Sequence, residues 1–260
     1  MRVRLAAAAA LAAALVTTGC GSGSSDDGGT AGGGGSPGTG ARGTVTVLAA
    51  ASLTESFDEI GTLFEERNPN LDVTFSYGGS SGLAQQIANG APADVFAAAS
   101  DATLKTVGDD AGTPAVFAKN QLVIAVAKGN PKGITSLAAL AKPDLKVALC
   151  AEQVPCGAAA TKALGGVSVT PVTLEQDVKA ALAKVKLGEV DAALVYRTDA
   201  RAAATDVDGV EFPESAQAVN DYPIAALKDA PNPEGARAFV TFVQSAEAQQ
   251  VLADAGFQRP

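Results

Sequence analysis

The sequence predicts an α/β fold for the region that begins near Thr44 and continues to the C-terminus. Short β-branched or apolar runs alternate along this region with segments whose apolar residues recur at helical spacing. Of the 260 residues, 47% are hydrophobic and 18% are charged, which is enough apolar material for a sizeable core. Strands that alternate with helices are typical of mainly parallel sheets covered by helices.

Buried strands are expected where β-branched and apolar residues run together. TVTVLAA and QLVIAVA are apolar almost throughout, as in strands buried on both faces, whereas LDVTFSY alternates between apolar and polar residues. The expected strands are 44–50, 71–77, a short strand near Val95, 121–127, 145–149 and 191–196.

Helices are expected where apolar residues recur three or four positions apart. Leu53, Phe57, Ile60 and Phe64 show this spacing in the first helix, and Gly188 is typical of the residue that ends a helix. The expected helices are 53–67, 83–90, one that begins around Gly157, 178–187, and 234–253 with a break near Ser245.

The N-terminus has the three parts of an export signal: MRVR is basic, LAAAAALAAALV is apolar, and TTGC supplies small residues. The apolar run is too short for a secure membrane span, although a transmembrane anchor is the alternative. LVTTGC resembles a bacterial lipobox, so residues 1–19 are expected to be a lipoprotein signal peptide and Cys20 to be lipidated. The protein would then be anchored on the outer face of the cytoplasmic membrane.

The glycine residues are unevenly distributed. The chain has 28, and 11 of them lie among the 23 residues 21–43. Because this segment has almost no side chain that could bury apolar area, 20–43 is expected to be the lipidated cysteine followed by a flexible linker.

Composition excludes several function classes. The sequence has no His, so Ser–His or Cys–His catalysis and imidazole metal ligands are impossible. A formal net charge of −9 argues against a nucleic-acid partner. Cys150 and Cys156 are six residues apart and, outside the cytoplasm, are expected to form a disulfide. The alternative is two free buried thiols, and a zinc site is disfavoured with two thiols and no His.

Two expected helix starts carry serine residues. Ser52 follows the first strand, and Glu55 three residues later allows a capping box, so Ser52 is either a helix cap or a ligand donor. In YGGSSG, Ser80 and Ser81 offer hydroxyl and N–H groups where glycines let the backbone approach a ligand, or they form an ordinary turn.

Two further helix starts present backbone N–H groups. One lies in EQVPCGAAATKAL around Gly157. The other lies at Val178, where two caps compete: Thr173 with Gln176 as a capping box, or Asp177, which would leave the Val178 N–H free.

Helix N-termini and hydroxyl groups without a cation are typical of an anion site built from dipoles. Such a site has no proton acceptor for its ligand. It therefore favours a fully ionised anion such as molybdate or sulfate over hydrogen phosphate, which must donate a hydrogen bond.

At this point the sequence resembles a known family, the molybdate-binding proteins of bacterial ABC importers. The resemblance covers nearly all of 44–260 and rests on several segments in order. These are VLAAASLTESFDEI, GGSSGLAQQIANGAPADVFAAAS, NQLVIAVAKGN, EQVPCGAAATKAL, DVKAALAKVKLGEVDAALVYRTDA and AQQVLADAGF.

The resemblance implies a two-lobed fold of the type II periplasmic-binding-protein kind. Each lobe would be a mainly parallel sheet flanked by helices. Lobe 1 would comprise 44–122 and 223–260, and lobe 2 would comprise 123–222. The two crossover segments would lie near Leu122–Val126 and Pro223–Ala226.

The resemblance also implies the residues that bind the oxyanion. Ser52 and Ser80 would donate hydroxyl and N–H groups, Cys156 and Val178 would donate backbone N–H groups, and Tyr196 would donate its phenol. Ser81 is an adjacent, lower-ranked candidate. Cys156 falls where the family often has Ala, and a backbone donor tolerates that change. The alternative for Tyr196 is a core tyrosine with a satisfied hydroxyl.

The expected function is an extracytoplasmic substrate-binding lipoprotein that captures molybdate, and tungstate as well, and delivers it to a membrane ABC permease. It would be a monomer, use no cofactor and catalyse no reaction. One rival is a binding protein for sulfate, thiosulfate or phosphate; another is a surface adhesion module. A secreted acyl-transfer enzyme with Ser52 or Ser80 as nucleophile is a third, but neither serine has a His partner or a Lys at S-x-x-K spacing.

Overall fold

The computed structural model describes residues 41–260. The expected signal peptide 1–19, Cys20 and all but the last three residues of the linker lie outside the described residues. Among the helices of 41–260, none has the length and hydropathy that a membrane crossing requires.

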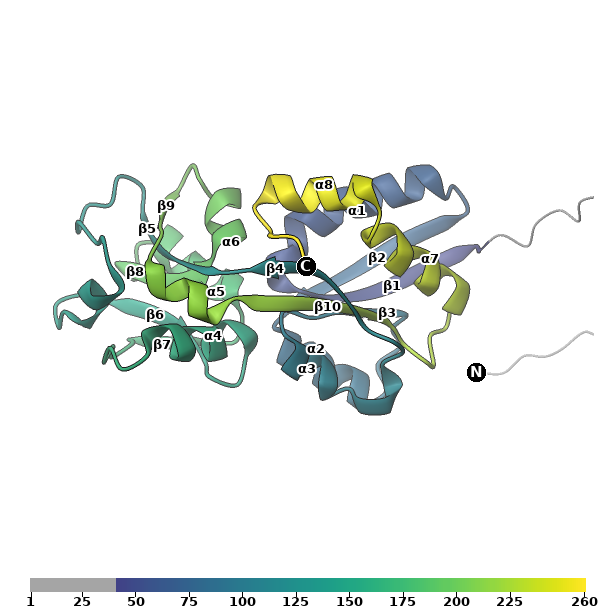
Figure 1. Cartoon of the computed structure of the whole chain (residues 1–260), viewed down its shortest axis with the longest axis horizontal. Coiled ribbons are helices and arrows are strands. Elements are labelled where there is room, and N and C mark those ends of the chain that lie inside the picture. The colour runs from purple at the N-terminus through teal and green to yellow at the C-terminus, as the bar shows by residue number, and fades with distance from the viewer. Residues whose placement is uncertain (1–40) are drawn as a thin grey trace, which may run out of the picture. The chain divides into compact units, whose positions relative to one another are not determined.

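Two five-stranded sheets form the framework of this region (Figure 1). The first sheet has the order β2-β1-β3-β10-β4 and the second the order β7-β6-β8-β5-β9. We call the part of the chain built on each sheet the first and the second lobe. The strands of the first are β1 Gly43–Ala50, β2 Leu71–Gly78, β3 Val95–Ala97, β4 Ala115–Asn120 and β10 Asn220–Ala226. Those of the second are β5 Leu122–Ala127, β6 Val147–Cys150, β7 Thr173–Glu175, β8 Ala192–Tyr196 and β9 Val207–Val210.

The two sheets share one plan, and both are mixed. In each, three parallel strands are followed by a strand antiparallel to its neighbours: β10 beside β3 and β4, and β5 beside β8 and β9. The prediction of a two-lobed α/β fold with mainly parallel sheets is confirmed, since in each sheet four of the five strands point in one direction and a single strand runs the other way. Each antiparallel strand, β5 or β10, directly follows a crossing between lobes.

Helices cover both sheets. Around the first lie α1 Thr54–Arg67, α2 Ser80–Ala88, α3 Asp101–Lys105, α7 Pro233–Val243 and α8 Ala246–Ala255; around the second lie α4 Pro155–Leu164, α5 Val178–Lys186 and α6 Arg197–Ala202. Four short 3₁₀ turns are η1 Ala51–Leu53, η2 Gly108–Asp110, η3 Leu137–Ala141 and η4 Pro213–Ala218. The predicted break near Ser245 is confirmed, since its side chain accepts the Ala248 N–H and begins α8.

The crossings between lobes lie earlier than expected. Only Gln121 separates β4 in the first sheet from β5 in the second, so Leu122 belongs to the second sheet. The return crossing lies between Val210 and Asn220, three residues before the expected limit at 223. The segments Leu122–Val126 and Pro223–Ala226 are themselves parts of strands β5 and β10. The first crossing passes through Gln121 alone, whereas the return crossing includes the 3₁₀ turn η4.

The first lobe owes its rigidity to an aromatic core. The Phe57 ring lies 5.7–6.0 Å from the rings of Phe75, Phe117 and Phe239, measured between centroids. Such pairs add stability beyond the area they bury. This core fixes α1 on the sheet and so positions the turn before it, which carries Ser52.

Candidate functional site

A small cavity of about 20 Å³ lies between the two lobes, where strands end and helices begin. A cavity of this size excludes a large organic molecule. The five residues named from the sequence all border it. The full lining is Ala50, Ala51, Ser52, Gly78, Gly79, Ser80, Ala99, Val154, Pro155, Cys156, Gln176, Asp177, Val178 and Tyr196.

Ser52 lies in the 3₁₀ turn η1 between β1 and α1 and is 4% exposed. Its Oγ is 2.8 Å from the Tyr222 Oη, and either group can donate. The capping alternative is wrong: α1 has Leu53 as its N-cap residue with no side-chain cap, and the Glu55 carboxylate bonds Lys179 instead. The inserted 3₁₀ turn moves Ser52 away from the capping position.

Ser80 is the first residue of α2, which begins three residues earlier than expected. The Ala99 N–H donates to Ser80 Oγ over 3.0 Å. Ser81 points elsewhere, since its Oγ donates to the Gln153 carbonyl over 2.7 Å and it does not border the cavity. Position 79 requires glycine, because a Cβ there would collide with the Gln176 carbonyl of the other lobe.

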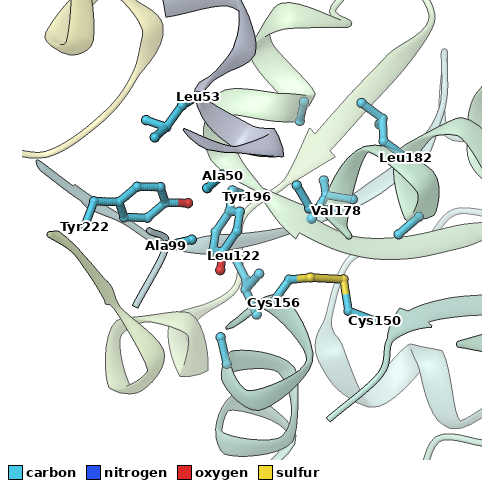
Figure 2. Close-up of a cluster of buried hydrophobic side chains, with 14 of the residues drawn as sticks. Ala50, Leu53, Ala99, Leu122, Cys150, Cys156, Val178, Leu182, Tyr196 and Tyr222 are labelled. Carbon is cyan, nitrogen blue, oxygen red and sulfur yellow. A yellow bond between two sulfur atoms is a disulfide. The ribbon is translucent and has the colours of Figure 1, made fainter. Parts of the chain in front are cut away.

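Cys156 lies in the first turn of α4 and forms a disulfide with Cys150, with Cα atoms 5.7 Å apart (Figure 2). Gly157 allows this loop to close tightly, because any side chain there would collide with the Ala151 carbonyl. The disulfide and the glycine therefore fix the N-terminus of α4 at the cavity.

Val178 is the first residue of α5. The Asp177 cap is confirmed, since its Oδ1 accepts the Ala180 N–H over 2.9 Å. This bond leaves the Val178 N–H available, because the first N–H groups of a helix have no partner within it. The competing cap is wrong: Thr173 lies in β7, and its hydroxyl donates to Glu175.

Tyr196 is the last residue of β8 and is 1% exposed. The Asn220 Nδ2 donates to its Oη over 2.8 Å, and its own N–H donates to Asp199 Oδ2 over 3.2 Å. Its ring meets that of Tyr222 edge to face, with centroids 5.9 Å apart (Figure 2). Burial raises the pKa of Tyr196 well above its usual value, so the phenol keeps its proton.

The hydroxyl groups at the cavity are arranged as donors. Ser80 Oγ and Tyr196 Oη each already accept a hydrogen bond from a protein N–H. A hydroxyl carries a single proton, and an N–H cannot accept it, so neither of these two bonds uses the hydroxyl proton. At Tyr196 the neighbouring Tyr222 hydroxyl competes with a ligand for that proton. Ser52 likewise keeps its proton for a ligand when Tyr222 donates to it.

The electrostatics of the cavity come from helix ends. The helices α2, α4 and α5 begin at its wall, and each brings first-turn N–H groups and the positive end of a helix dipole. Among residues 41–260, no Lys or Arg borders the cavity, and the only carboxylate in its lining is the capping group of Asp177. Within 41–260 there is also no cluster of three His, Cys, Asp or Glu side chains that could hold a metal ion. The arrangement suits an anion held by neutral donors.

Sequence reasoning missed Asn220 and Tyr222, which support the site from β10. Asn220 backs Tyr196, and Tyr222 backs Ser52. The sequence signal for these two residues was weak: they are polar residues at the start of the otherwise apolar segment VNDYPIAA. Their role depends on β10 returning to the first sheet.

Comparison with known proteins places the chain in a family. The family described as "Bacterial extracellular solute-binding protein" matches residues 45–258. The chain belongs to this family.

This solute-binding protein resembles known proteins both in sequence and in fold. The molybdate-binding protein ModA of Mycobacterium bovis is 45% identical over 229 residues, which cover 86% of this chain and 87% of that protein. Two solved structures share the fold. The periplasmic molybdate-binding protein of Azotobacter vinelandii has a TM-score of 0.73 at 20% identity, over 83% of this chain and 99% of that one. The sulfate-binding protein SubI of Mycobacterium tuberculosis has a TM-score of 0.72 at 21% identity, over 83% and 86%. At these identities the two structures show the fold alone.

Proposed function

We propose that this solute-binding protein captures molybdate in the cavity between its lobes and delivers it to an ABC permease. The observation that carries the proposal is the wall of neutral donors, drawn from both lobes and from three helix N-termini, around a small cavity. The 45% identity to a molybdate-binding protein supports the choice of anion.

The donors divide between the lobes. Ser52 and Ser80 on the first lobe bind the anion in an open form, and closure adds Cys156, Val178 and Tyr196 from the second lobe. A buried dianion without a cation requires that its oxygens be hydrogen-bonded. Hydroxyl, phenol and N–H groups meet that requirement because each carries a proton that it can donate to the ligand. Cleft closure around a ligand is a common motion of two-lobed proteins.

Selectivity follows from the same donor set. Hydrogen phosphate must donate a proton, whereas the hydroxyl and N–H groups proposed to hold the anion act as donors. Tungstate has nearly the size of molybdate and binds similarly, whereas sulfate is smaller and leaves the donors at longer distances. Sulfate or another tetrahedral oxyanion is the alternative ligand, since a sulfate-binding protein shares this fold.

Delivery requires that the protein reach the membrane. Lipidated Cys20, followed by the glycine-rich 21–43, would tether a monomer to the outer face of the cytoplasmic membrane beside the permease. No reaction is proposed, because Ser52 and Ser80 have no His in the chain to activate them.

Calorimetric titration of the purified protein with molybdate, tungstate, sulfate and phosphate tests the proposal. We expect molybdate and tungstate to bind most tightly and phosphate not to bind at equal concentration. Equal affinity for sulfate and molybdate would assign the protein to oxyanions in general, and the absence of any binding would reject the proposed function.

A further inference from the structure

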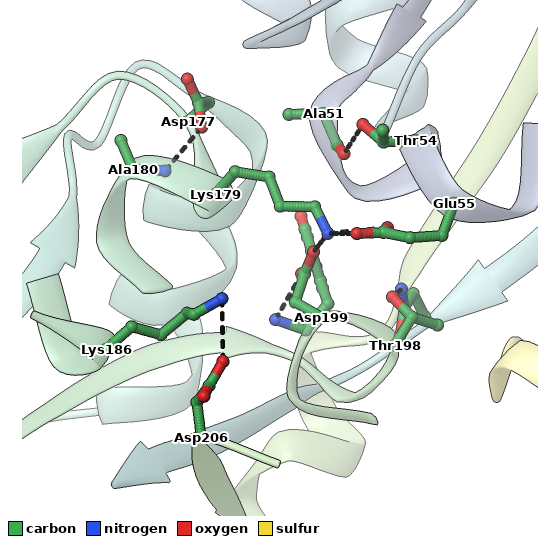
Figure 3. Close-up of polar contacts among 12 residues, drawn as sticks. Ala51, Thr54, Glu55, Asp177, Lys179, Ala180, Lys186, Thr198, Asp199 and Asp206 are labelled. Carbon is green, nitrogen blue, oxygen red and sulfur yellow. Dashed lines mark hydrogen bonds and ion pairs between the residues drawn. The ribbon is translucent and has the colours of Figure 1, made fainter. Parts of the chain in front are cut away.

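An ion pair joins the two lobes beside the cavity (Figure 3). The Lys179 Nζ on α5 lies 2.6 Å from Glu55 Oε1 and 2.7 Å from Oε2 on α1. α1 packs on the first sheet and α5 on the second, so this contact exists only while the lobes are close together.

A third residue holds Lys179 in place. The Lys179 Nζ is 3.4 Å from Asp199 Oδ1, and Asp199 is fully buried at 0% exposure. This oxygen has no hydrogen-bond partner, so Lys179 is the cation that compensates it. Because Asp199 and Lys179 belong to the same lobe, this pair persists when the cleft opens and keeps the ammonium aimed at the opposite lobe.

The cross-lobe contacts are made by residues that adjoin the proposed donors. Glu55 follows Ser52 by three residues, and Lys179 follows Val178 directly. Across the cavity, the Ser81 hydroxyl donates to the Gln153 carbonyl of the other lobe. Closure that brings the donors around an anion therefore forms these contacts in the same movement.

We propose that the Glu55–Lys179 pair, oriented by Asp199, is a closure latch that slows release of the anion without contacting it. This inference rests on the proposed function, because a latch on the closed form needs a ligand that closes the cleft. Glu55 and Lys179 are positioning residues. A ligand-free open form lacks the Glu55–Lys179 pair, so the pair stabilises the closed form alone.

The primary test uses Glu55→Gln, whose side chain is 55% exposed and whose loss leaves Lys179 paired with Asp199. Molybdate affinity is measured by calorimetry, and dissociation by stopped-flow tyrosine fluorescence. We expect dissociation to be roughly three- to tenfold faster, with a smaller change in the association rate. In Lys179→Met, which also leaves Asp199 without its cation and so lowers stability, we expect the same acceleration of dissociation. In the double variant we expect dissociation no faster than in Lys179→Met alone. Lys179→Arg should restore most of the affinity.

Salt provides a readout that a purely structural role would not change. Raising the ionic strength should speed dissociation from the wild type more than from Glu55→Gln, since salt screens the pair. The matched control is Glu247→Gln, which removes the Arg67–Glu247 pair of 3.1 Å within the first lobe. This control should leave both rates unchanged.

The outcomes separate the two proposals. If the wild type binds molybdate and Glu55→Gln and Lys179→Met release it at the wild-type rate, the latch is wrong and the proposed function stands. If the wild type binds no molybdate, the proposed function itself fails, and the latch fails with it.

Discussion

Asn220 donates a hydrogen bond to the phenolic oxygen of Tyr196 over 2.8 Å and thereby ties the first residue of β10 to the last residue of β8. The same Asn220 amide donates to the Ala99 carbonyl over 2.8 Å. The Asn220 side chain thus links the two lobes behind the cavity. Because its amide donates to the Tyr196 oxygen, the Tyr196 proton must point away from Asn220. The predictions below begin from this contact.

Replacing Asn220 with Ala removes the group that orients the Tyr196 phenol. We expect molybdate affinity to fall roughly tenfold, because a hydrogen bond to a charged ligand loses its alignment. In the background of Tyr196→Phe, the same replacement should cause little further loss in calorimetry. Full additivity of the two losses would show that Asn220 acts independently of Tyr196.

Removing a hydroxyl donor from the first lobe tests the site directly. For Ser52→Ala and for Ser80→Ala we expect molybdate affinity to fall ten- to a hundredfold, since hydrogen bonds to charged groups contribute about 1.5–3 kcal/mol each. The control is Ser245→Ala, which removes the α8 cap and lowers the stability to unfolding by about 1 kcal/mol without changing affinity. Unchanged affinity in both site variants would remove these serines from the site.

The disulfide is expected to support stability more than binding. Replacing Cys150 and Cys156 together with Ala should lower the free energy of unfolding by about 2 kcal/mol, as for a short closed loop. Molybdate affinity should fall less than tenfold, because residue 156 contributes only its backbone N–H. Urea denaturation and calorimetry measure the two effects. Complete loss of binding in a folded double variant would contradict a backbone role.

Asp199 should make a specific contribution to the pH dependence of stability. Burial raises the pKa of Asp199 from 3.8 to about 6, although Lys179 opposes the shift and Glu55 adds to it. A carboxyl group with a raised folded-state pKa stabilises the fold fully below pH 3.8, and this contribution is lost as the pH rises through about 6. Relative to Asp199→Asn, the wild type should therefore lose about 3 kcal/mol of stability between these limits.

Urea denaturation of both proteins across this pH range measures the difference. Glu211→Gln is the control of opposite sign, because Arg197 lowers the pKa of Glu211. Relative to that variant, the wild type should lose stability as the pH falls. A difference between wild type and Asp199→Asn that does not change with pH would contradict the raised pKa.

Much of the fold was predictable from local pattern. The runs in 44–50 and 121–127 became β1 and β5, and the spacing of Phe57, Ile60 and Phe64 became the buried face of α1. The short or half-exposed strands β4, β7 and β9 were not predicted, because strands of three to six residues with mixed burial have no clear periodicity. β10 was not predicted as a strand either, because its polar first residues interrupt the apolar pattern that its last residues follow.

The sequence by itself determined the α/β class, the absence of histidine chemistry and the helix N-termini with free N–H groups. Each of these is a local property of residue types and their spacing. Only the tertiary structure decided that Ser52 bonds Tyr222 rather than capping α1, that Ser81 reaches Gln153, and that Lys179 joins Glu55 to Asp199. The Ser52–Tyr222, Ser81–Gln153 and Glu55–Lys179 contacts join residues 72 to 170 positions apart. The packing of the two sheets and their helices sets these contacts, and no local pattern encodes them.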